Sequence, residues 1–231
     1  MEQKLDRVGK VLSEVPVILL MIAVYCIPST VLDFVSEFIR KTDTPDKLVP
    51  ITGINTIIPI IAILLTVSMY LLIAKEINIF KFDKSFINMK NILIILVGTI
   101  LARLIVYSGI LALMVQGIES TQNDVILSEV LKGYSWYLIA SIGVLLAPIT
   151  EEIIYRGYIM GHLFKNSKPI IGILINSFLF GLMHNVNNLT SLLLYSSIGI
   201  LLSVSYQKTK RLEIPIAIHM LNNYIAFFTV L

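Results

Sequence analysis

The chain has 231 residues, of which 56% are hydrophobic and only 14% are charged, and its mean hydropathy is +0.85. A soluble domain is typically about 45–50% apolar and about 25% charged, so this composition excludes an ordinary soluble protein and predicts a membrane protein. The net charge of +3 is small, and the basic residues are spread among the predicted loops, which argues against a nucleic-acid partner. The single cysteine, Cys26, excludes an internal disulfide and a cysteine metal site.

Seven apolar stretches are predicted to be membrane-spanning helices. They are residues 16–35, 51–74, 91–115, 135–164, 169–185, 189–206 and 214–231. A bilayer is crossed by about 20 apolar residues, so several stretches are long enough and the fifth and seventh are short. A basic segment precedes the first stretch, as in a signal peptide, but this stretch is long and lacks a cleavage site, so we expect a retained helix. The predicted fold is an all-α polytopic transmembrane helical bundle of about seven spans, forming a single domain over residues 1–231.

The loops predict an orientation, because Lys and Arg gather on the cytoplasmic side of membrane proteins. Segments 75–90 and 207–213 are rich in basic residues and are predicted to be cytoplasmic, whereas 116–134 has one lysine and three acidic residues and is predicted to lie outside. The N-terminus is then cytoplasmic and the C-terminus external. The loop 38–50 is then outside although it contains three basic residues, which this rule does not favour.

Three ionisable residues lie inside the fourth predicted helix: Glu151, Glu152 and Arg156. Charged groups in a bilayer are costly, so such a cluster predicts a functional site. Glu152 and Arg156 are four residues apart and are expected to pair on one face, whereas Glu151 points about 100° away and is left free. Pro148 removes a backbone hydrogen bond one turn earlier and is expected to kink the helix. The alternative, a structural ion pair between helices, accounts for only one of the two glutamates.

Two of the three histidines also lie in apolar stretches. His184 follows Phe180 by four residues, and His219 precedes Asn223 by four, so each pair shares a helix face. A lone histidine in such a position is more often a hydrogen-bonding contact between helices. Together with Glu151, however, these residues supply a carboxylate, two imidazoles and a carboxamide, which are the groups needed to activate water and to stabilise an oxyanion.

Two mechanisms are compatible with this set of residues. In the first, Glu151 and His184 hold a water molecule and Glu151 takes its proton as the water attacks a peptide carbonyl, while His219 and Asn223 donate hydrogen bonds to the oxyanion. The neighbouring ion pair orients the site. In the second, a zinc ion bound by Glu151, His184 and His219 lowers the pKa of its own water. The sequence leaves the metal-free mechanism and the zinc cofactor equally open.

Three motifs occur in order within the apolar stretches: Glu-Glu-x-x-x-Arg at 151–156, Phe-x-x-x-His at 180–184 and His-x-x-x-Asn at 219–223. This pattern resembles the CPBP intramembrane proteases, which comprise CAAX prenyl endopeptidases and bacteriocin-processing or bacteriocin-immunity proteins, also called the Abi family. The resemblance covers residues 140–226, within a motif-bearing core of about 135–231, and says little about the first three spans.

The resemblance implies a helical membrane bundle whose site lies in a cavity that opens towards the cytosol. By the same resemblance, Glu151 and His184 match the water-activating pair, and His219 and Asn223 match the oxyanion donors. Members of the family are described both as metalloproteases and as metal-free glutamate proteases, so the resemblance also leaves the cofactor open.

The predicted function is therefore that of a CPBP-type intramembrane endopeptidase in a bacterial plasma membrane. Its expected partners are the lipid bilayer and a substrate that is a peptide or a membrane protein: a prenylated C-terminus, a bacteriocin leader or a signalling-peptide leader. The physiological role is processing or self-immunity. The alternative is a non-catalytic bacteriocin-immunity or peptide-sequestering membrane protein, which would not depend on a general base.

Two further polar residues lie in the apolar stretches. Arg103, in the third predicted helix, requires a partner or a water-filled cavity and is expected to form a structural pair. His162, near the inner end of the fourth helix, is expected at the membrane interface.

Overall fold

The computed structural model describes residues 2–43, 51–80 and 83–230, and within these ranges the chain forms helices and loops but no strand. Its α-helices are α1 (Glu2–Tyr25), α2 (Ile27–Asp43), α3 (Ile57–Glu76), α4 (Met89–Val115), α5 (Gln122–Val130), α6 (Trp136–Ala140), α7 (Ala147–Glu152), α8 (Pro169–Leu182), α9 (Leu189–Thr209) and α10 (Glu213–Val230). The 3₁₀ turns are η1 (Gly53–Thr56) and η2 (Lys84–Phe86), and the π-helical segments are η3 (Ser141–Leu146) and η4 (Ile153–Leu163). The predicted all-α bundle is confirmed.

By length and composition, five helical stretches of the described chain suffice to cross a membrane. They are Glu14–Phe38, Gly53–Glu76, Met89–Val115, Trp136–Leu163 and Leu189–Thr209, and α8 is a shorter apolar helix. Together with α10, these helices coincide with all seven predicted spans, and the protein is a multi-pass membrane protein. Two parts of the topology prediction, residues 44–50 and Lys81, lie outside the described residues.

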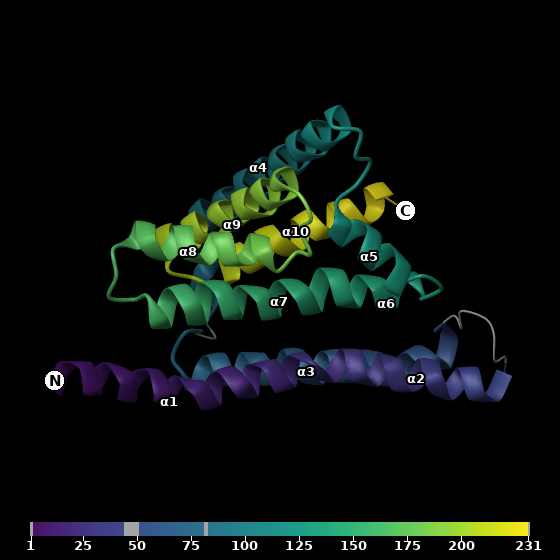
Figure 1. Ribbon diagram of the computed structural model, residues 1–231, viewed down its shortest axis with the longest axis horizontal. Coiled ribbons are helices and arrows are strands. Elements are labelled where there is room, and N and C mark those ends of the chain that lie inside the picture. The colour runs from purple at the N-terminus through teal and green to yellow at the C-terminus, as the bar shows by residue number, and fades with distance from the viewer. Residues whose placement is uncertain (1, 44–50, 81–82, 231) are drawn as a thin grey trace.

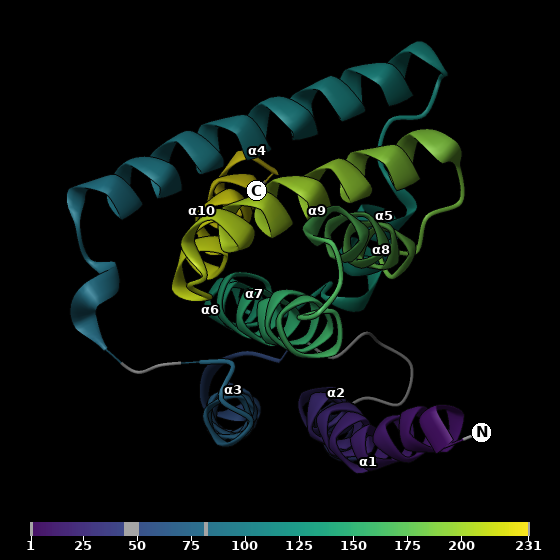
Figure 2. The same ribbon diagram turned by 90° about the vertical axis from the view of Figure 1, so that its left-hand side faces the viewer.

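The helices form two groups on opposite sides of one long helix (Figures 1 and 2). That long helix runs from Trp136 to Leu163 through α6, η3, α7 and η4. Helices α1, α2 and α3 lie on one side of it, and α4, α8, α9 and α10 lie on the other. The long helix, which carries the acidic motif, is therefore covered on both sides.

The first predicted span is divided in the structure, because α1 ends at Tyr25 and α2 begins at Ile27. The residue between them is Cys26, whose carbonyl accepts hydrogen bonds from the Ser29 and Thr30 hydroxyls, both at 2.9 Å. Pro28 has no N–H to continue the helical ladder at this point, and the two hydroxyl bonds add to the backbone bond that the Cys26 carbonyl accepts from the Thr30 N–H at 3.1 Å.

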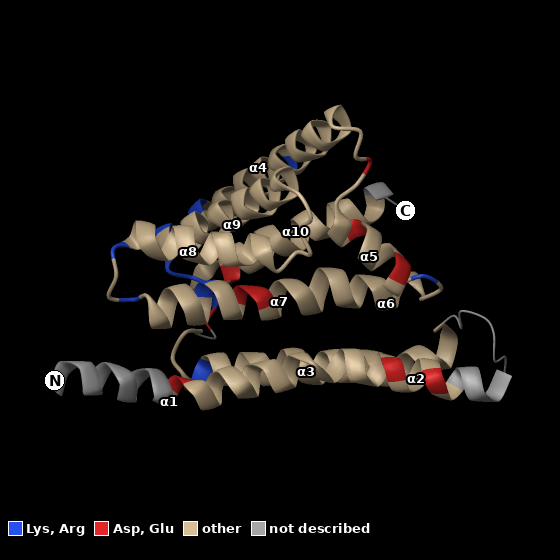
Figure 3. Ribbon diagram, viewed as in Figure 1, with Lys and Arg blue, Asp and Glu red and all other residues tan. Residues whose placement is uncertain are grey.

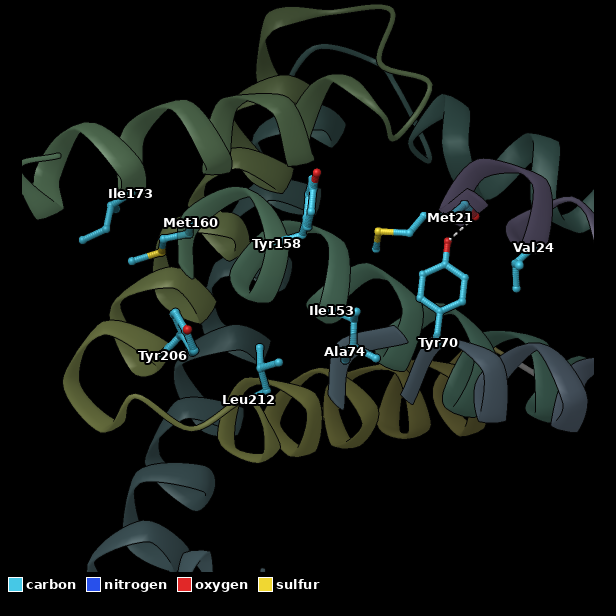
Figure 4. Packing of buried hydrophobic residues seen from close by; sticks show 10 residues of the cluster. All are labelled: Met21, Val24, Tyr70, Ala74, Ile153, Tyr158, Met160, Ile173, Tyr206 and Leu212. Carbon is cyan, nitrogen blue, oxygen red and sulfur yellow. Dashed lines mark hydrogen bonds between the residues drawn. The ribbon is translucent and has the colours of Figure 1, made fainter. Parts of the chain in front are cut away.

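One buried cluster joins the two sides of the bundle (Figure 4). Met21 of α1, Tyr70 of α3, Ile153 and Tyr158 of η4, and Leu212 just before α10 all belong to it. The Tyr70 hydroxyl donates to the Met21 carbonyl at 2.8 Å, which fixes α1 against α3. The long helix is thus held to the first three helices by apolar packing and by a buried hydrogen bond.

The π-helical segments lie before and after the two glutamates. The first of them, η3, ends at Leu146, two residues before Pro148, where the sequence predicts a kink. A second π-helical segment, η4, begins at Ile153, directly after Glu152. Segments of this kind are rare and often accompany functional sites, because they shift the angular position of the side chains that follow.

Helices α8 and α9 approach each other closely through small and polar residues. Ser177 and Gly199 are in direct contact, and the Asn176 side chain donates to the Ser203 hydroxyl at 2.8 Å. Small residues of this kind allow helix backbones to pack in a membrane, and interhelical hydrogen bonds add to the contact. This packing fixes the carbonyl of Gly199, which faces the acidic motif.

A polar contact outside the membrane spans positions the start of α10. Arg211 forms ion pairs with Asp83 at 3.0 Å and with Glu213 at 2.6 Å. Hydrogen bonds from Ser85, together with the guanidinium of Arg211, lower the pKa of Asp83 from 3.8 to about 2. The loop before α4 is therefore tied to the first turn of α10.

We expect Gly199→Ala to destabilise the protein, because the added Cβ would lie 2.9 Å from the Ser177 Cα and 3.0 Å from its carbonyl oxygen. Overpacking of this kind typically costs about 1–3 kcal/mol. The matched control is Gly172→Ala on α8, whose added Cβ would meet side-chain atoms of Met160 and Phe164 at an ordinary 3.5 Å. Thermal unfolding in detergent measures both variants, and equal melting temperatures would contradict the prediction.

Candidate active site

The candidate site lies where four segments meet. Glu151 and Glu152 end α7, Arg156 lies in the first turn of η4, Phe180 lies in the last turn of α8, and His219 lies in the second turn of α10. His184 is in the turn after α8, and Asn223 lies one turn beyond His219. The Phe180 ring contacts both imidazoles, with centroid distances of 4.5 Å to His184 and 5.9 Å to His219. The structure thus brings the three motifs together.

The predicted ion pair between Glu152 and Arg156 is present and fully buried. Arg156 Nη1 donates to Glu152 Oε1 at 2.9 Å, and both side chains have no exposed surface. Arg156 Nη2 donates to the Gly199 carbonyl at 3.0 Å, and its guanidinium lies 4.6 Å from the centre of the Phe180 ring. One oxygen, Glu152 Oε2, and Arg156 Nε have no hydrogen-bond partner among the described residues.

His219 forms a contact that the sequence did not predict. Its Nδ1 lies 2.9 Å from Glu152 Oε1, the same oxygen that Arg156 contacts. A carboxylate accepts hydrogen bonds, so Nδ1 carries a hydrogen and donates it. The other ring nitrogen, Nε2, is then the one left to interact with a substrate.

Glu151 differs from its neighbour in having no paired charge. Its Oε2 is buried and accepts no hydrogen bond from any described residue. The side chains within electrostatic reach of it include Tyr25 of α1, Tyr155 of η4 and His184. The two glutamates are therefore separated as predicted: Glu152 pairs with Arg156, whereas Glu151 forms no ion pair within the described residues.

The orientation of His184 is fixed by one hydrogen bond and two rings. Its Nδ1 lies 2.6 Å from the Phe180 carbonyl oxygen, and because a carbonyl only accepts, Nδ1 carries the hydrogen. In the neutral imidazole, Nε2 then holds a lone pair and can accept a hydrogen bond. The ring also stacks on Tyr195 of α9, with a centroid distance of 4.3 Å and an interplanar angle of 21°.

The amide of Asn223 is held by the π-helical segment of the long helix. Its Nδ2 donates to the Gly143 carbonyl at 2.9 Å, and its Oδ1 accepts from Asn222 Nδ2 at 3.3 Å. A primary amide has two N–H hydrogens, so one remains for another acceptor. Asn222 is itself buried, and its Oδ1 has no partner among the described residues.

The side chains do not fit the metal site that the sequence left open. Within the described residues, no three His, Cys, Asp or Glu side chains are grouped so as to hold a metal ion. Nδ1 of His184 is bonded to a carbonyl and Nδ1 of His219 to Glu152, so each imidazole has its Nε2 left for other contacts.

The other two polar residues of the apolar stretches lie apart from these contacts. His162 contacts Glu14 at 3.0 Å and stacks on Tyr158, so it binds α1 to η4. Arg103 lies 4.8 Å from the centre of the Tyr107 ring, and its Nε and Nη1 have no hydrogen-bond partner among the described residues. The structural ion pair expected for Arg103 is not found within the described chain.

Sequence reasoning missed three contributors to the site: Tyr195 and the carbonyls of Gly143 and Gly199. Backbone carbonyls leave no signal in a sequence, because every residue has one. An aromatic residue in an apolar helix is common in a membrane protein, so Tyr195 had no distinguishing pattern either.

We expect Arg156→Met to lower stability strongly, because it leaves the buried carboxylate of Glu152 without its cation. Removing one partner of a buried pair typically costs about 3–5 kcal/mol. The double variant Glu152→Gln/Arg156→Met leaves no buried charge in the pair and should recover part of the loss. Thermal unfolding in detergent tests this, with exposed Lys132→Met as the control; an Arg156→Met protein as stable as the control would contradict it.

Comparison with known proteins identifies the C-terminal part of the chain. Residues 133–225 match the family described as Type II CAAX prenyl endopeptidase Rce1-like. No solved structure matches the chain.

Three curated relatives, all bacterial, are similar to it. The membrane peptidase YdiL of Bacillus subtilis (strain 168) is 35% identical over 107 residues, which are 46% of this chain and 42% of that protein. The membrane-embedded CAAX protease MroQ of Staphylococcus aureus (strain USA300) is 35% identical over 94 residues, 38% and 37% of the two chains. The UPF0177 protein YvdC of Lactococcus lactis subsp. lactis (strain IL1403) is 31% identical over 175 residues, 74% and 65% of the two chains.

The chain thus spans less than two thirds of the length of each of these relatives. The matched segment contains all three sequence motifs and every side chain of the candidate site. Over residues 133–225, the chain is therefore similar to the Rce1-like CAAX prenyl endopeptidase family.

Proposed function

We propose that this protein is an intramembrane endopeptidase in which Glu151, assisted by His184, activates a water molecule for attack on a peptide carbonyl. The observation that carries the proposal is that Glu151 has a buried, unpartnered Oε2 and forms no ion pair within the described residues, whereas Glu152 is paired with Arg156 and His219. A carboxylate whose charge is already paired is a poor base, whereas a buried oxygen without a partner is free to accept a proton. The family match and the names of the relatives support the same class of reaction.

The first step uses two hydrogen-bond acceptors, one on Glu151 and one on His184. Glu151 Oε2 and the lone pair of His184 Nε2 are available to accept the two O–H groups of one water molecule. As the water oxygen bonds to the peptide carbonyl carbon, Glu151 takes one proton and the carbonyl becomes an oxyanion. The tetrahedral intermediate collapses when the C–N bond breaks, and the same proton passes from Glu151 to the departing amine. The products are a carboxylic acid and a free amine.

The oxyanion requires donors, and His219 and Asn223 supply them. His219 donates from Nε2 only when both of its nitrogens carry hydrogen. In that form, the negative charges of Glu151 and Glu152 are balanced by Arg156 and His219, so the buried cluster carries no net charge. This balance matters because uncompensated charge is costly away from water. Asn223 donates the N–H that does not bond to Gly143.

The proposed substrate is a peptide or a membrane-protein segment that reaches the site within the bilayer. One relative is named a CAAX protease and another a membrane peptidase, which supports a substrate of this class. We expect this one hydrolytic activity to serve either self-immunity or the processing of a prenylated C-terminus, a bacteriocin or a signalling peptide.

We place the N-terminus in the cytoplasm and the C-terminus outside. Figure 3 supports this orientation, because the basic segments between helices, including those before α8 and before α10, gather at the end of the bundle where the chain begins. Acidic residues of α2 and α5 lie towards the opposite end. Positive residues favour the cytoplasmic side, which is expected to be that of a plasma membrane.

We expect Glu151→Gln to abolish turnover while preserving fold and substrate binding. The amide keeps the shape of the side chain but cannot take a proton, so kcat should fall by at least about 10²–10⁴. The exposed Glu129→Gln is the matched control. Turnover is measured by mass spectrometry of a peptide mixture incubated with proteoliposomes, and folding by the melting temperature. Wild-type cleavage by the Glu151→Gln protein would refute the role of Glu151 as the general base. Retention of a cellular phenotype without any cleavage would indicate a sequestering protein.

Asn223→Ala should lower kcat by about 10²–10³ with little change in KM, because it removes a donor that acts on the developing oxyanion. Asn222→Ala is the comparison, since the Asn222 side chain bonds to the Asn223 oxygen and its own Oδ1 has no partner among the described residues, so its loss should have a smaller effect. The same proteoliposome assay measures both. A larger loss of kcat in Asn222→Ala than in Asn223→Ala would contradict the prediction, because it would identify Asn222 as the oxyanion donor.

A further inference from the structure

The backbone around His184 does not fix the orientation of its side chain. It follows the end of α8 at Leu182 and precedes Asn185, whose φ of 47° lies in the left-handed region. Its own N–H bonds to the Gly181 carbonyl as part of a turn. A residue in such a turn lacks the regular helical surroundings that restrict a side chain, so the imidazole depends on neighbouring side chains for its orientation.

We propose that Tyr195 is the positioning residue for His184 and that it is in turn anchored by Thr121, on the loop leading into α5. The tyrosine ring lies against the imidazole at 4.3 Å and 21°. Its hydroxyl shares a 2.8 Å hydrogen bond with Thr121 Oγ1, and both side chains are buried. The inference rests on the proposed role of His184 in holding the attacking water.

Thr121, which anchors Tyr195, is itself held in place by a local hydrogen bond. Thr121 is the N-cap residue of α5, and its Oγ1 accepts the backbone N–H of Asp124 at 3.1 Å. The same oxygen therefore caps a helix and meets the Tyr195 hydroxyl. A capping side chain is held by the helix that it starts. The Tyr195 hydroxyl is therefore bonded to a side chain of fixed position, on a segment far away in sequence.

The stack controls the direction of the lone pair on His184 Nε2. The hydrogen bond from Nδ1 to the Phe180 carbonyl holds one nitrogen, but small rotations about the Cα–Cβ and Cβ–Cγ bonds still change the direction in which Nε2 points. The flat face of Tyr195 restricts this rotation, because a rotated imidazole would lose its parallel contact. The tyrosine therefore acts through His184 and does not itself touch the reacting atoms.

The experiment compares Tyr195→Leu, which removes the ring, with Tyr195→Phe and Thr121→Val, which keep the stack and remove the hydrogen bond. The matched control is Tyr206→Leu, since Tyr206 is buried on the same helix but belongs to the cluster around Leu212, whereas Tyr195 belongs to the cluster around Phe180. Each variant is assayed for kcat, KM and melting temperature in proteoliposomes.

We expect Tyr195→Leu to lower kcat about 10- to 100-fold with KM changed less than about threefold, because a small misplacement of an acceptor costs rate more than binding. Tyr195→Phe and Thr121→Val should each lower kcat about three- to tenfold, because both remove the hydrogen bond between these two hydroxyls. Thr121→Val also removes the cap of α5 and should therefore lower the melting temperature as well. Tyr206→Leu should lose stability without this loss of kcat.

A second readout does not depend on turnover. The chain has three histidines, so a sample with isotope-labelled histidine gives three imidazole signals, and His184→Gln identifies the one of interest. Stacking on Tyr195 shifts the ring protons of His184, and Tyr195→Leu should remove this shift while Tyr195→Phe keeps it. An unmoved His184 signal together with wild-type kcat in Tyr195→Leu would overturn the inference. A wild-type protein without peptidase activity would instead overturn the proposed function, and the spectrum would still decide whether Tyr195 positions the ring.

Discussion

The structure depends on the buried ion pair of Glu152 with Arg156. Both side chains have no exposed surface, and burial of a charge is tolerated only when it is paired and hydrogen-bonded. Their remaining contacts reach the other elements: Arg156 bonds to the Gly199 carbonyl and lies over Phe180, while Glu152 bonds to His219. The long helix, α8, α9 and α10 are therefore held around one pair of charges.

This constraint also separates the two glutamates chemically. Neighbouring residues on a helix point in directions about 100° apart, so only one of them can join the pair. Glu152 holds Arg156 and His219 and leaves Glu151 with a buried, unpartnered oxygen. The same arrangement that stabilises the bundle thus supplies a free base and an oriented imidazole for the proposed hydrolysis.

The surroundings of the site extend beyond the matched segment 133–225. Tyr25 of α1 lies within electrostatic reach of Glu151, and Tyr158 of η4 donates to Glu14 of α1 at 2.7 Å. On the opposite side, Thr121 meets Tyr195 behind His184. Residues outside the three motifs, Tyr25 and Thr121 among them, therefore contribute to the surroundings of the reactive groups.

The sequence by itself determined the membrane bundle, since apolar stretches of bilayer length must form helices to satisfy their backbone groups. It also determined the pair of Glu152 with Arg156, because residues four apart share a helix face. Only the tertiary structure decided that His219 bonds to Glu152 and that His184 stacks on Tyr195. Those contacts depend on how separate helices are rotated and tilted against one another, and helical periodicity specifies the faces of each helix but not which faces meet.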